Sequence, residues 1–596
     1  MQNAAPEGHS GSPSLGDFST NSRVLLLSLM AVPVGAIGAV VAKLLLWLIS
    51  VISNAAYYHQ WSSLMTSPRM NHLGLWAILV PVAGSMAVGL MARYGSEKIR
   101  GHGIPEALEA ILLGKSRIDP KVAILKPVSS AISIGTGGPF GAEGPIIMTG
   151  GAFGSIFAQF FHLSAAERKA LLTAGAAAGM SAVFATPVAA ILLSVELLLF
   201  EWKPRSLVPV SVAAVVASLA RVPLIGPGPI FPVPAHGTLS AGLLCGALVV
   251  GVAAGLCSGA LTALVYFCED MFSRLPIHWM WWPAIGGLAV GIGGALDPRV
   301  LGVGYDTIHG LLRGDLPLLA LATLALAKGV VWSVALGSGT SGGVLAPLLM
   351  IGGAAGALFG APLGVGDPGL WAMVGMAGMM GGTMRSPFTG MMFLLELTRD
   401  LNALPALLIG SIAAYCVTVL LLRRSILTEK LARRGQHVAR EYAVDVFELS
   451  RVADVMDRNP PVAPASEPVA SLSGRIAGGD PVLSRRQATI LVDGAGLLAG
   501  ILTRGDLMRA MHDRANDPRA SLDVAATDVE VTYPEETLLS AFARMSRRGV
   551  GRLPVVEGPA SRRVVGYLGR ADILAARSRL IAEEERLERG PVPAGG

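Results

Sequence analysis

Apolar residues dominate the first 440 positions and fall into thirteen blocks, which polar or Gly/Pro-rich stretches separate. A helix needs about 20 residues to cross a bilayer core, so several blocks are too short and others must tilt. Broken apolar helices are tolerated in a membrane only where they line a protein-enclosed cavity. The pattern predicts an all-α membrane domain of broken, tilted helices over residues 23–435. The blocks are 24–56, 74–93, 121–136, 145–162, 169–202, 206–220, 240–268, 281–296, 316–336, 344–363, 370–382, 386–398 and 402–422.

The two halves of this apolar region repeat each other. Lys126 aligns with Lys328 at an offset of 202 residues. Further along, Glu196 aligns with Glu396 at an offset of 200 residues, and we interpret this pair as structural. Two homologous halves are typical of membrane transporters, whose substrate site lies at the repeat interface. The sequence repeat leaves the relative orientation of the halves open.

Charge distinguishes the last 156 residues from the rest of the chain. Residues 441–596 carry 42 charged side chains, about 27%, whereas the preceding 440 residues carry 46, about 10%. Two stretches there show alternating apolar residues around a polar turn, followed by an Asp that caps a helix. We expect two α/β domains. The expected boundaries are a linker at 436–450, domains at 451–514 and 515–578, and a tail at 579–596.

The ends of the membrane region indicate its orientation. Residues 1–22 lack the basic start and apolar core of a signal peptide, so we expect a disordered tail. Basic residues cluster at 423–434, directly after the last apolar block, which places this end in the cytoplasm by the positive-inside rule. We therefore expect a multi-pass protein of the cell (inner) membrane with its C-terminal domains in the cytoplasm.

Composition excludes several other classes of protein. The net charge of +6 is the sum of +8 before residue 441 and −2 after it, so basicity gives no support for nucleic-acid binding. The four cysteines lack metal-ligand spacing, and we expect no metal site. GTSGG at 339–343 lies between apolar helices without His or Asp partners, so a serine hydrolase is excluded. The chain lacks a GxxxxGK[ST] phosphate loop. We expect no enzymatic activity.

Three glycine-rich segments carry the candidate chemistry: 101–107, 135–145 and 337–347, which read GHGIPEA, GTGGPFGAEGP and GSGTSGGVLAP. Each runs into an apolar helix start, where free N–H groups and the helix dipole favour an anion. A cation site would need carboxylates, of which these segments hold few. The alternative is that the glycines only allow close helix packing.

These motifs resemble those of the CLC family of chloride channels and proton-coupled chloride transporters. The family signatures GSGIP, GREGP and GxFxP correspond here to GHGIP, GAEGP and GVLAP, in the same order. The resemblance covers roughly residues 24–435. It implies a homodimer with one anion pathway per subunit and two inverted repeats in each subunit. The anion-binding residues that follow are His102, Gly103, Ile104, Gly141, Ala142, Gly144, Val344, Leu345 and Leu427.

Glu143 is the candidate gate. Its repeat counterpart is Leu345, so the fold itself does not need a carboxylate there. An ionisable residue at membrane depth is costly and by default functional. A carboxylate at a helix start can occupy the anion site and leave it when protonated, which is the role that the resemblance assigns to the Glu of GREGP. The alternative is a purely structural cap.

Several positions depart from the family pattern. His102 replaces a Ser, Leu345 a Phe, Ala142 an Arg and Leu427 the anion-coordinating Tyr. The His102 imidazole could replace the serine hydroxyl and change its charge near neutral pH. A histidine that faces solvent or packs against a helix is the alternative.

The internal glutamate of the family's proton-coupled exchangers is Leu197 here, which favours a channel. The first alternative is chloride/proton exchange with protons routed past Glu201 or Glu196. In either case protons act at the gating glutamate. An alternative from another class is a CBS-regulated metal-ion transporter, which would need acidic residues along its pore.

The two C-terminal domains resemble a tandem pair of CBS domains, which often bind adenosine nucleotides. GILTRGD and GYLGRAD stand in place of the family's closing motif. The resemblance makes Thr503, Asp506 and Asp572 the nucleotide-binding candidates, although Gly569 replaces the hydroxyl residue of the second motif. We expect no required cofactor, with an adenine nucleotide as the one candidate ligand. A module that only stabilises or dimerises the protein is the alternative.

Overall fold

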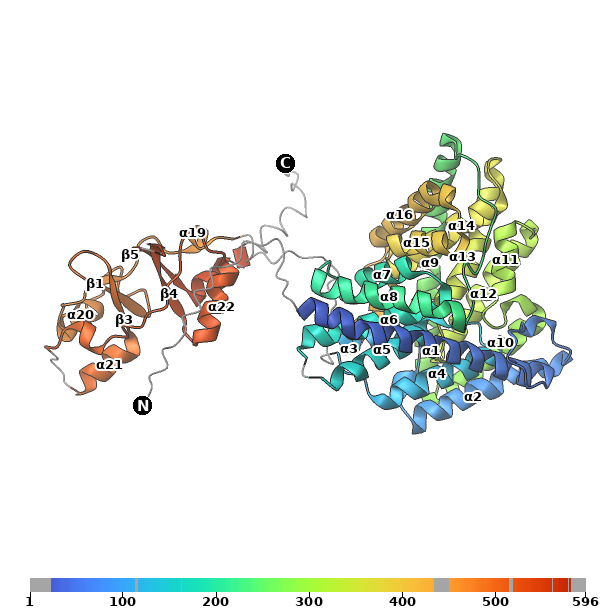
Figure 1. The fold of residues 1–596 in the computed structure, drawn as a ribbon, viewed down its shortest axis with the longest axis horizontal. Helices are drawn as coiled ribbons and strands as arrows, with labels where there is room; N and C mark the ends of the chain where they lie inside the picture. The colour runs from blue at the N-terminus through green and yellow to red at the C-terminus, as the bar shows by residue number, and fades with distance from the viewer. Residues whose placement is uncertain are drawn as a thin grey trace. The chain divides into compact units, whose positions relative to one another are not determined.

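The computed structural model describes residues 23–112, 116–161, 163–433, 450–513, 518–559, 561–576 and 578–579. Contacts divide the chain into two compact units, residues 1–440 and 441–596 (Figure 1). We call them the membrane unit and the C-terminal unit. The tail expected at 1–22, the linker expected at 436–450 except its last residue, and the tail expected at 579–596 beyond its first residue lie outside the described residues.

The described elements of the membrane unit are all helical, as the sequence predicts. Among the described residues, eight segments are long and apolar enough to cross a membrane. The first half holds α1 (Arg23–Tyr58), α2 (Leu79–Tyr94), α3 (Ile104–Leu112), α4 (Pro120–Gly135), α5 (Glu143–Gln159), α6 (Ala165–Phe184), α7 (Pro187–Leu193), the π-helical η4 (Ser194–Leu199) and α8 (Pro204–Leu224). The second half holds α9 (Ala241–Ser273), α10 (Trp282–Leu296), α11 (Tyr305–Arg313), α12 (Leu318–Gly337), α13 (Leu345–Gly360), α14 (Pro368–Met384), α15 (Pro387–Thr398) and α16 (Leu404–Leu421), followed by α17 (Ile426–Arg433).

Short 3-10 turns join some of these helices. They are η1 (Pro68–Met70), η2 (Gly74–Ile78), η3 (Glu97–Ile99), η5 (Trp279–Trp281), η6 (Pro298–Val300), η7 (Ala361–Leu363) and η8 (Leu401–Ala403).

Reciprocal hydrogen bonds relate the two halves. Glu196 in η4 accepts N–H bonds from Phe388 and Thr389 at the start of α15, at 3.2 and 2.8 Å. Glu396 in α15 accepts N–H bonds from the two equivalent residues of α7, at 3.0 and 2.8 Å. An exchange of equivalent contacts in both directions is the mark of an approximate two-fold axis. The structure therefore confirms the internal repeat, and each glutamate caps a helix of the other half.

One apolar block of the sequence is broken in the structure. The block at 169–202 was expected as a single segment, but it divides into α6, α7 and η4. Ala185 takes a left-handed conformation with φ 58°, and α7 starts two residues later at Pro187. The left-handed Ala185 ends the hydrogen-bond ladder of α6, and Pro187, which lacks an N–H, is suited to the first turn of the next helix. The second half repeats the break at Arg385, also with φ 58°, before α15.

Close glycine contacts bring the helices of each half together. A Cβ on Gly175 of α6 would lie 2.1 Å from the carbonyl oxygen of Gly150 in α5. A Cβ on Gly375 of α14 would lie 2.2 Å from the carbonyl oxygen of Gly352 in α13. Small residues let membrane helices approach backbone to backbone. This packing fixes α5 and α13, whose N-termini form the site described below.

The segment between the halves is held by His236. Its Nε2 lies 2.8 Å from Asp367 at the start of α14, and its Nδ1 bonds Asp400, which follows α15. The hydrogen bond that Asp367 accepts from the imidazole, together with the one that Asp400 accepts, raises the pKa of His236 to about 9 despite partial burial. A protonated imidazole thus bridges two carboxylates from the second half.

The C-terminal unit is α/β, as predicted. Its first repeat holds α19 (Val452–Val455), β1 (Val462–Pro464), α20 (Val469–Ala477), β2 (Ala488–Val492), β3 (Leu498–Thr503) and α21 (Arg504–Asp513). Its second repeat holds η9 (Ser521–Val524), α22 (Leu538–Arg548), β4 (Arg552–Gly558) and β5 (Ser561–Gly569). β1 pairs parallel with β2, and β2 pairs antiparallel with β3. β4 and β5 form an antiparallel hairpin, so both expected hairpins are present.

Candidate anion site at three glycine-rich loops

The three glycine-rich segments meet in the interior of the membrane unit. Gly141 and Gly343 exchange backbone hydrogen bonds of 3.3 and 2.8 Å. The N–H of Gly342 also donates to the carbonyl oxygen of Gly101 at 3.4 Å. Since Gly141 and Gly343 are equivalent positions of the repeat, this mutual pairing lies on the approximate two-fold axis. The sequence could suggest, but not establish, that the three segments converge.

Glu143 lies at this junction, with its carboxylate against the second half. Glu143 is the first residue of α5 and is fully buried. Its Oε1 accepts N–H bonds from Leu345, the first residue of α13, and from Ala346 at 3.3 Å. Its Oε2 has no hydrogen-bond partner among the described residues. The carboxylate therefore occupies the N-terminus of α13, the position that a helix offers to an anion.

Glycine leaves the room that this carboxylate needs. A Cβ on Gly141 would lie 1.9 Å from Glu143 Oε2, and a Cβ on Gly343 would lie 2.4 Å from Glu143 Oε1. A Cβ on Gly144 would lie 2.0 Å from the carbonyl oxygen of His102. Real Cβ atoms do not approach other atoms so closely, so these glycines shape the site as well as pack the helices.

Two buried lysines hold the loops around the site. Lys126 in α4 donates to two carbonyl oxygens of the first loop, including that of Gly101 at 2.7 Å. Lys328 in α12 donates to the two equivalent oxygens of the second half, including that of Gly302 at 3.1 Å. Each lysine thereby fixes the loop before a short helix. The sequence marked these lysines only as repeat positions. Both lysines lie in apolar blocks of the sequence, where a charged side chain is costly, and this position could have indicated that they have a specific structural role.

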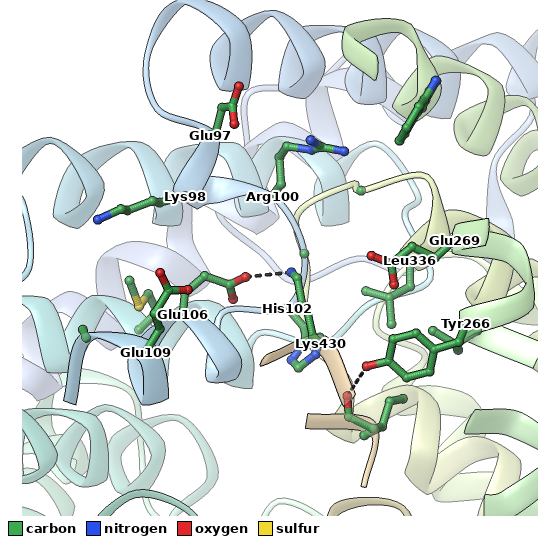
Figure 2. Close-up of a pocket in the computed structure, with 18 of the residues that line it drawn as sticks. Glu97, Lys98, Arg100, His102, Glu106, Glu109, Tyr266, Glu269, Leu336 and Lys430 are labelled. Carbon is green, nitrogen blue, oxygen red and sulfur yellow. Dashed lines mark hydrogen bonds and ion pairs between the residues drawn. The ribbon is translucent and has the colours of Figure 1, made fainter. Parts of the chain in front are cut away.

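His102 lines a cavity of about 720 Å³ beside the junction (Figure 2). The residue is 3% exposed, and its Nδ1 has no hydrogen-bond partner among the described residues. Lys430 extends from α17 into the same cavity and pairs with Glu106 of α3 at 2.7 Å. Glu106 also accepts the N–H of Gly103 at 3.0 Å. This ion pair was missed, because Glu106 and Lys430 lie 324 positions apart in the sequence.

Leu427, the expected replacement for the family's tyrosine, is fully buried in α17. The cavity lining from α17 consists of Ile426 and Lys430. Tyr266 of α9 also lines this cavity, and its hydroxyl group donates to the carbonyl oxygen of Ile426 (Figure 2). The other expected anion-binding residues lie in the converging segments or at the helix starts that follow them: His102, Gly103, Ile104, Gly141, Ala142, Gly144, Val344 and Leu345.

The nucleotide candidates have structural partners in the C-terminal unit. The N–H and hydroxyl of Thr503 donate to Asp506 at 3.0 and 2.6 Å, which closes the start of α21. Partial burial alone would raise the pKa of Asp506, but the hydrogen bonds from Thr503 hold it below its usual range. Asp572 accepts the N–H of Gly569 at 2.8 Å and pairs with Arg486 at 2.9 Å. Arg486 also pairs with Asp457 at 2.6 Å.

The model of the voltage gated chloride channel family matches residues 83–419, more than half of the chain. The chain belongs to this family. The CBS domain model matches twice in this CLC protein, over residues 452–513 and 520–579. Its C-terminal unit is therefore a tandem CBS pair.

Named relatives of this CLC protein are bacterial. The voltage-gated ClC-type chloride channel ClcB of Escherichia coli is 32% identical over 369 residues, which cover 60% of this chain and 87% of the relative. A putative chloride channel protein, ClcB-like, of Ralstonia nicotianae is 27% identical over 376 residues, which cover 61% and 88%.

Solved structures of similar fold are CLC proteins as well. A slow cyanobacterial Cl⁻/H⁺ antiporter has a TM-score of 0.59 at 21% identity, covering 70% of this chain and 99% of its own. A CLC-type fluoride/proton antiporter has a TM-score of 0.58 at 21% identity, covering 67% and 97%. A eukaryotic CLC transporter has a TM-score of 0.57 at 18% identity, covering 92% and 98%. The two inverted repeats of broken helices are thus a CLC fold.

Proposed function

We propose that this CLC protein carries chloride or a similar small anion across the membrane along a pathway that Glu143 gates. The main support is the position of Glu143, whose Oε1 accepts the N–H groups of Leu345 and Ala346 at the start of α13. These groups would bind a permeating anion if the carboxylate left. Family membership sets aside the alternative of a metal-ion transporter.

Gating follows from the electrostatics of the helix start. An ionised carboxylate is attracted by the α13 N–H groups and by the positive end of the helix dipole. Protonation removes that charge, and the neutral carboxyl group then competes poorly with an anion. Protons therefore open the pathway, and a high anion concentration has the same effect by competition.

We propose a channel rather than an exchanger. Leu197 stands fully buried where proton-coupled relatives carry an internal glutamate, so the carboxylate of that route is missing. The E. coli relative is named a channel, which agrees with this proposal. The alternative is chloride/proton exchange, the activity named for the cyanobacterial protein of similar fold. Glu201 would be its candidate inner carboxylate, and it accepts the hydroxyl of Ser206 at 2.7 Å.

The test is chloride efflux from liposomes that contain the purified protein, with external pH recorded and the potential clamped by a potassium ionophore. We expect efflux without stoichiometric proton movement. Glu143→Gln should keep the pathway open and make efflux insensitive to pH. An unchanged pH dependence in this variant would refute the gating role. Proton movement in fixed ratio to chloride would establish exchange instead.

We further propose a homodimer in the cell (inner) membrane with the CBS pair in the cytoplasm. The basic cluster that includes Arg423, Arg424 and Lys430 supports this orientation by the positive-inside rule. The homodimer is what membership of the family implies. Protease accessibility of the CBS pair in spheroplasts and in inverted vesicles tests the orientation. Light scattering of the detergent-solubilised protein tests the assembly.

For the CBS pair we propose that an adenine nucleotide binds at the Thr503–Asp506 end. The carboxylate of Asp506 stays ionised, and its ion-pair partner Arg509 is largely exposed, so that pairing is weak. Asp572, in contrast, is already shared with Arg486 and Asp457. Calorimetric titration of the full chain with ATP tests this, with Asp506→Asn expected to abolish binding and Asp572→Asn to retain it. Loss of binding only in Asp572→Asn would refute the assignment.

A further inference from the structure

The connection between α1 and α2 is longer than the repeated architecture needs. It covers residues 59–78 and holds 20 residues, including the short turns η1 and η2. The equivalent connection of the second half, between α9 and α10, covers residues 274–281 and holds 8 residues. Since 8 residues are enough to join the equivalent pair of helices, the additional length in the first half needs another explanation.

The outward side of this connection is apolar. Six of its large apolar side chains are between 52% and 89% exposed in the described part of the chain. They are Trp61, Leu64, Met65, Met70, Leu75 and Trp76. A single exposed apolar residue is common on protein surfaces and needs no explanation. A group of them in one short segment marks a surface that contacts another apolar phase or partner.

The inward side of the connection is fixed to the rest of the membrane unit. The side-chain amide of Asn54, near the end of α1, donates to the carbonyl oxygens of Ser62 and Leu64 at 2.8 and 2.7 Å. Pro68 is buried, and its Cδ would be 3.4 Å from a Cβ on Gly302. The backbone of the connection is therefore ordered, and its apolar side chains are exposed from a fixed support.

Both ends of the connection lie at a boundary of the membrane. It leads from the end of one candidate span, Arg23–Tyr58, into the start of the next, Gly74–Tyr94. The second span ends just before Glu97 and Lys98, which line the same cavity as Lys430. The proposed orientation places that cavity on the cytoplasmic side. The connection belongs to the opposite end of the span and therefore to the outer side of the membrane.

A lipid surface matches the chemistry of this segment better than a protein partner does. Tryptophan is enriched where the hydrocarbon core meets the headgroups, because its ring is apolar and its N–H is polar. Trp47 of α1 and Leu79 of α2 are also about half exposed, so apolar exposure runs from the spans into the connection. Residues 59–78 include one arginine, two histidines and no acidic residue, so no carboxylate repels anionic headgroups.

We propose that residues 61–76 form an interfacial anchor, which inserts these six apolar side chains into the lipid leaflet at this end of α2. The anchor goes beyond the proposed transport function and does not depend on it. Only its assignment to the outer leaflet rests on the proposed orientation. Because Pro68 of the anchor packs against Gly302, the anchor also connects the bilayer surface to the loop that Lys328 holds.

The experiment uses the full chain with its four cysteines replaced by alanine, so that one introduced cysteine carries the dye NBD. Trp61→Cys and Trp76→Cys are labelled and reconstituted into vesicles of phosphatidylethanolamine and phosphatidylglycerol. Lipids brominated in the upper part of the acyl chain quench a dye in the leaflet, whereas iodide quenches a dye in water. We expect quenching by brominated lipid at both positions, as strong as at the lipid-facing control Leu90→Cys in α2. Ala495→Cys, in the exposed turn between β2 and β3, should be quenched by iodide alone.

A second measurement keeps all four cysteines. Brominated lipids quench part of the intrinsic tryptophan fluorescence of the wild-type protein in vesicles. The quenched part of the emission should be smaller in the double variant Trp61→Phe/Trp76→Phe. An unchanged quenched part would show that these two rings do not contact lipid. This measurement decides the proposal even if the cysteine-free chain does not fold.

The outcomes separate this inference from the proposed function. Quenching of both labelled positions by iodide and not by brominated lipid would place the side chains in water and overturn the anchor. Quenching by neither reagent would show that protein covers them, such as a second copy of this chain, and would overturn the assignment to lipid. Lipid quenching in a protein without chloride flux would refute the proposed function and leave the anchor standing.

Discussion

Gly141→Ala should open the gate without altering the gating carboxylate itself. A Cβ at this position would lie 1.9 Å from Glu143 Oε2 and 2.5 Å from Oε1, which no carboxylate can tolerate. Gly141 is not in the left-handed region, so alanine is compatible with its backbone. The smallest movement that relieves the clash is departure of the Glu143 side chain from the α13 N-terminus.

The expected size of the effect follows from the bonds that are lost. Glu143 accepts two N–H bonds at α13, and a hydrogen bond to a charged group contributes about 1.5–3 kcal/mol. Displacing the side chain thus removes about 3–6 kcal/mol from the closed state. About 5.5 kcal/mol shifts a two-state equilibrium from 1:99 to 99:1. The variant should therefore be largely open at neutral pH.

Chloride efflux from liposomes measures this prediction at pH 5, 7 and 9. Gly141→Ala should match Glu143→Gln in rate and in its lack of pH dependence. Gly151→Ala in the same helix is a control, because the nearest atom to its Cβ would be Leu172 Cδ2 at 3.3 Å and no atom of Glu143 would be in contact. Adding Gly141→Ala to Glu143→Ala should leave the efflux rate of the single Glu143→Ala variant unchanged, because the carboxylate that would clash with the new Cβ is absent. Wild-type rates and pH dependence in Gly141→Ala would refute the assigned carboxylate position.

Three further predictions concern stability. Because the pKa of His236 is raised from 6.5 to about 9, its stabilisation is complete below pH 6.5 and is lost as the pH rises through about 9. Thermal unfolding of the wild-type protein should show that the free energy of unfolding falls by about 2 kcal/mol over that pH range, a value reduced to allow for the solvent exposure of Asp367. The free energy of unfolding of His236→Gln should not change with pH over this range. The same pH dependence in both proteins would contradict the prediction. Glu396→Ala should lower the midpoint of thermal unfolding, because it removes about 2 kcal/mol of helix capping. The anion flux per folded protein should be unchanged. A change in the coupling of anion flux to protons would show that Glu396 has a role beyond capping. Arg486→Ala should accelerate amide hydrogen exchange in β5 and α19, because it removes about 1 kcal/mol of ion pairing with Asp457 and Asp572. Unchanged exchange rates would show that these two carboxylates do not need a shared cation.

The sequence predicted the parts that depend on local pattern. The broken apolar blocks and the helix starts after the glycine-rich segments are properties of neighbouring residues, and the repeat follows from aligning the two halves; the structure confirms all three. The family resemblance added the gating role of Glu143, which stays a prediction. The block at 169–202 was wrong as one segment. Prolines also lie inside the continuous helices α1 and α8, so Pro187 alone does not mark a break, and the left-handed turn at Ala185 has no glycine to reveal it.

Long-range pairing was beyond the sequence. The Glu106–Lys430 pair joins the third helix to the last one, and neither residue stands in a repeated position. The alignment put Leu427 at the tyrosine position of the family and predicted that this hydroxyl is missing, whereas Tyr266 of α9 places a hydroxyl group beside α17. A side chain that reaches a site from a distant helix can be recognised only when the packing of the helices is known.

The mutual pairing of Gly141 with Gly343 has a consequence for the origin of this architecture. The gating carboxylate comes from one half and the N–H groups that hold it come from the other, so neither half contains a complete site. A half-length ancestor could have built such a site only as a pair of identical chains inserted into the membrane in opposite orientations. Both chains would then have carried the same residue at the position of Glu143 and Leu345. Only after gene duplication could the two positions diverge, so a single-carboxylate gate is a property that duplication made available.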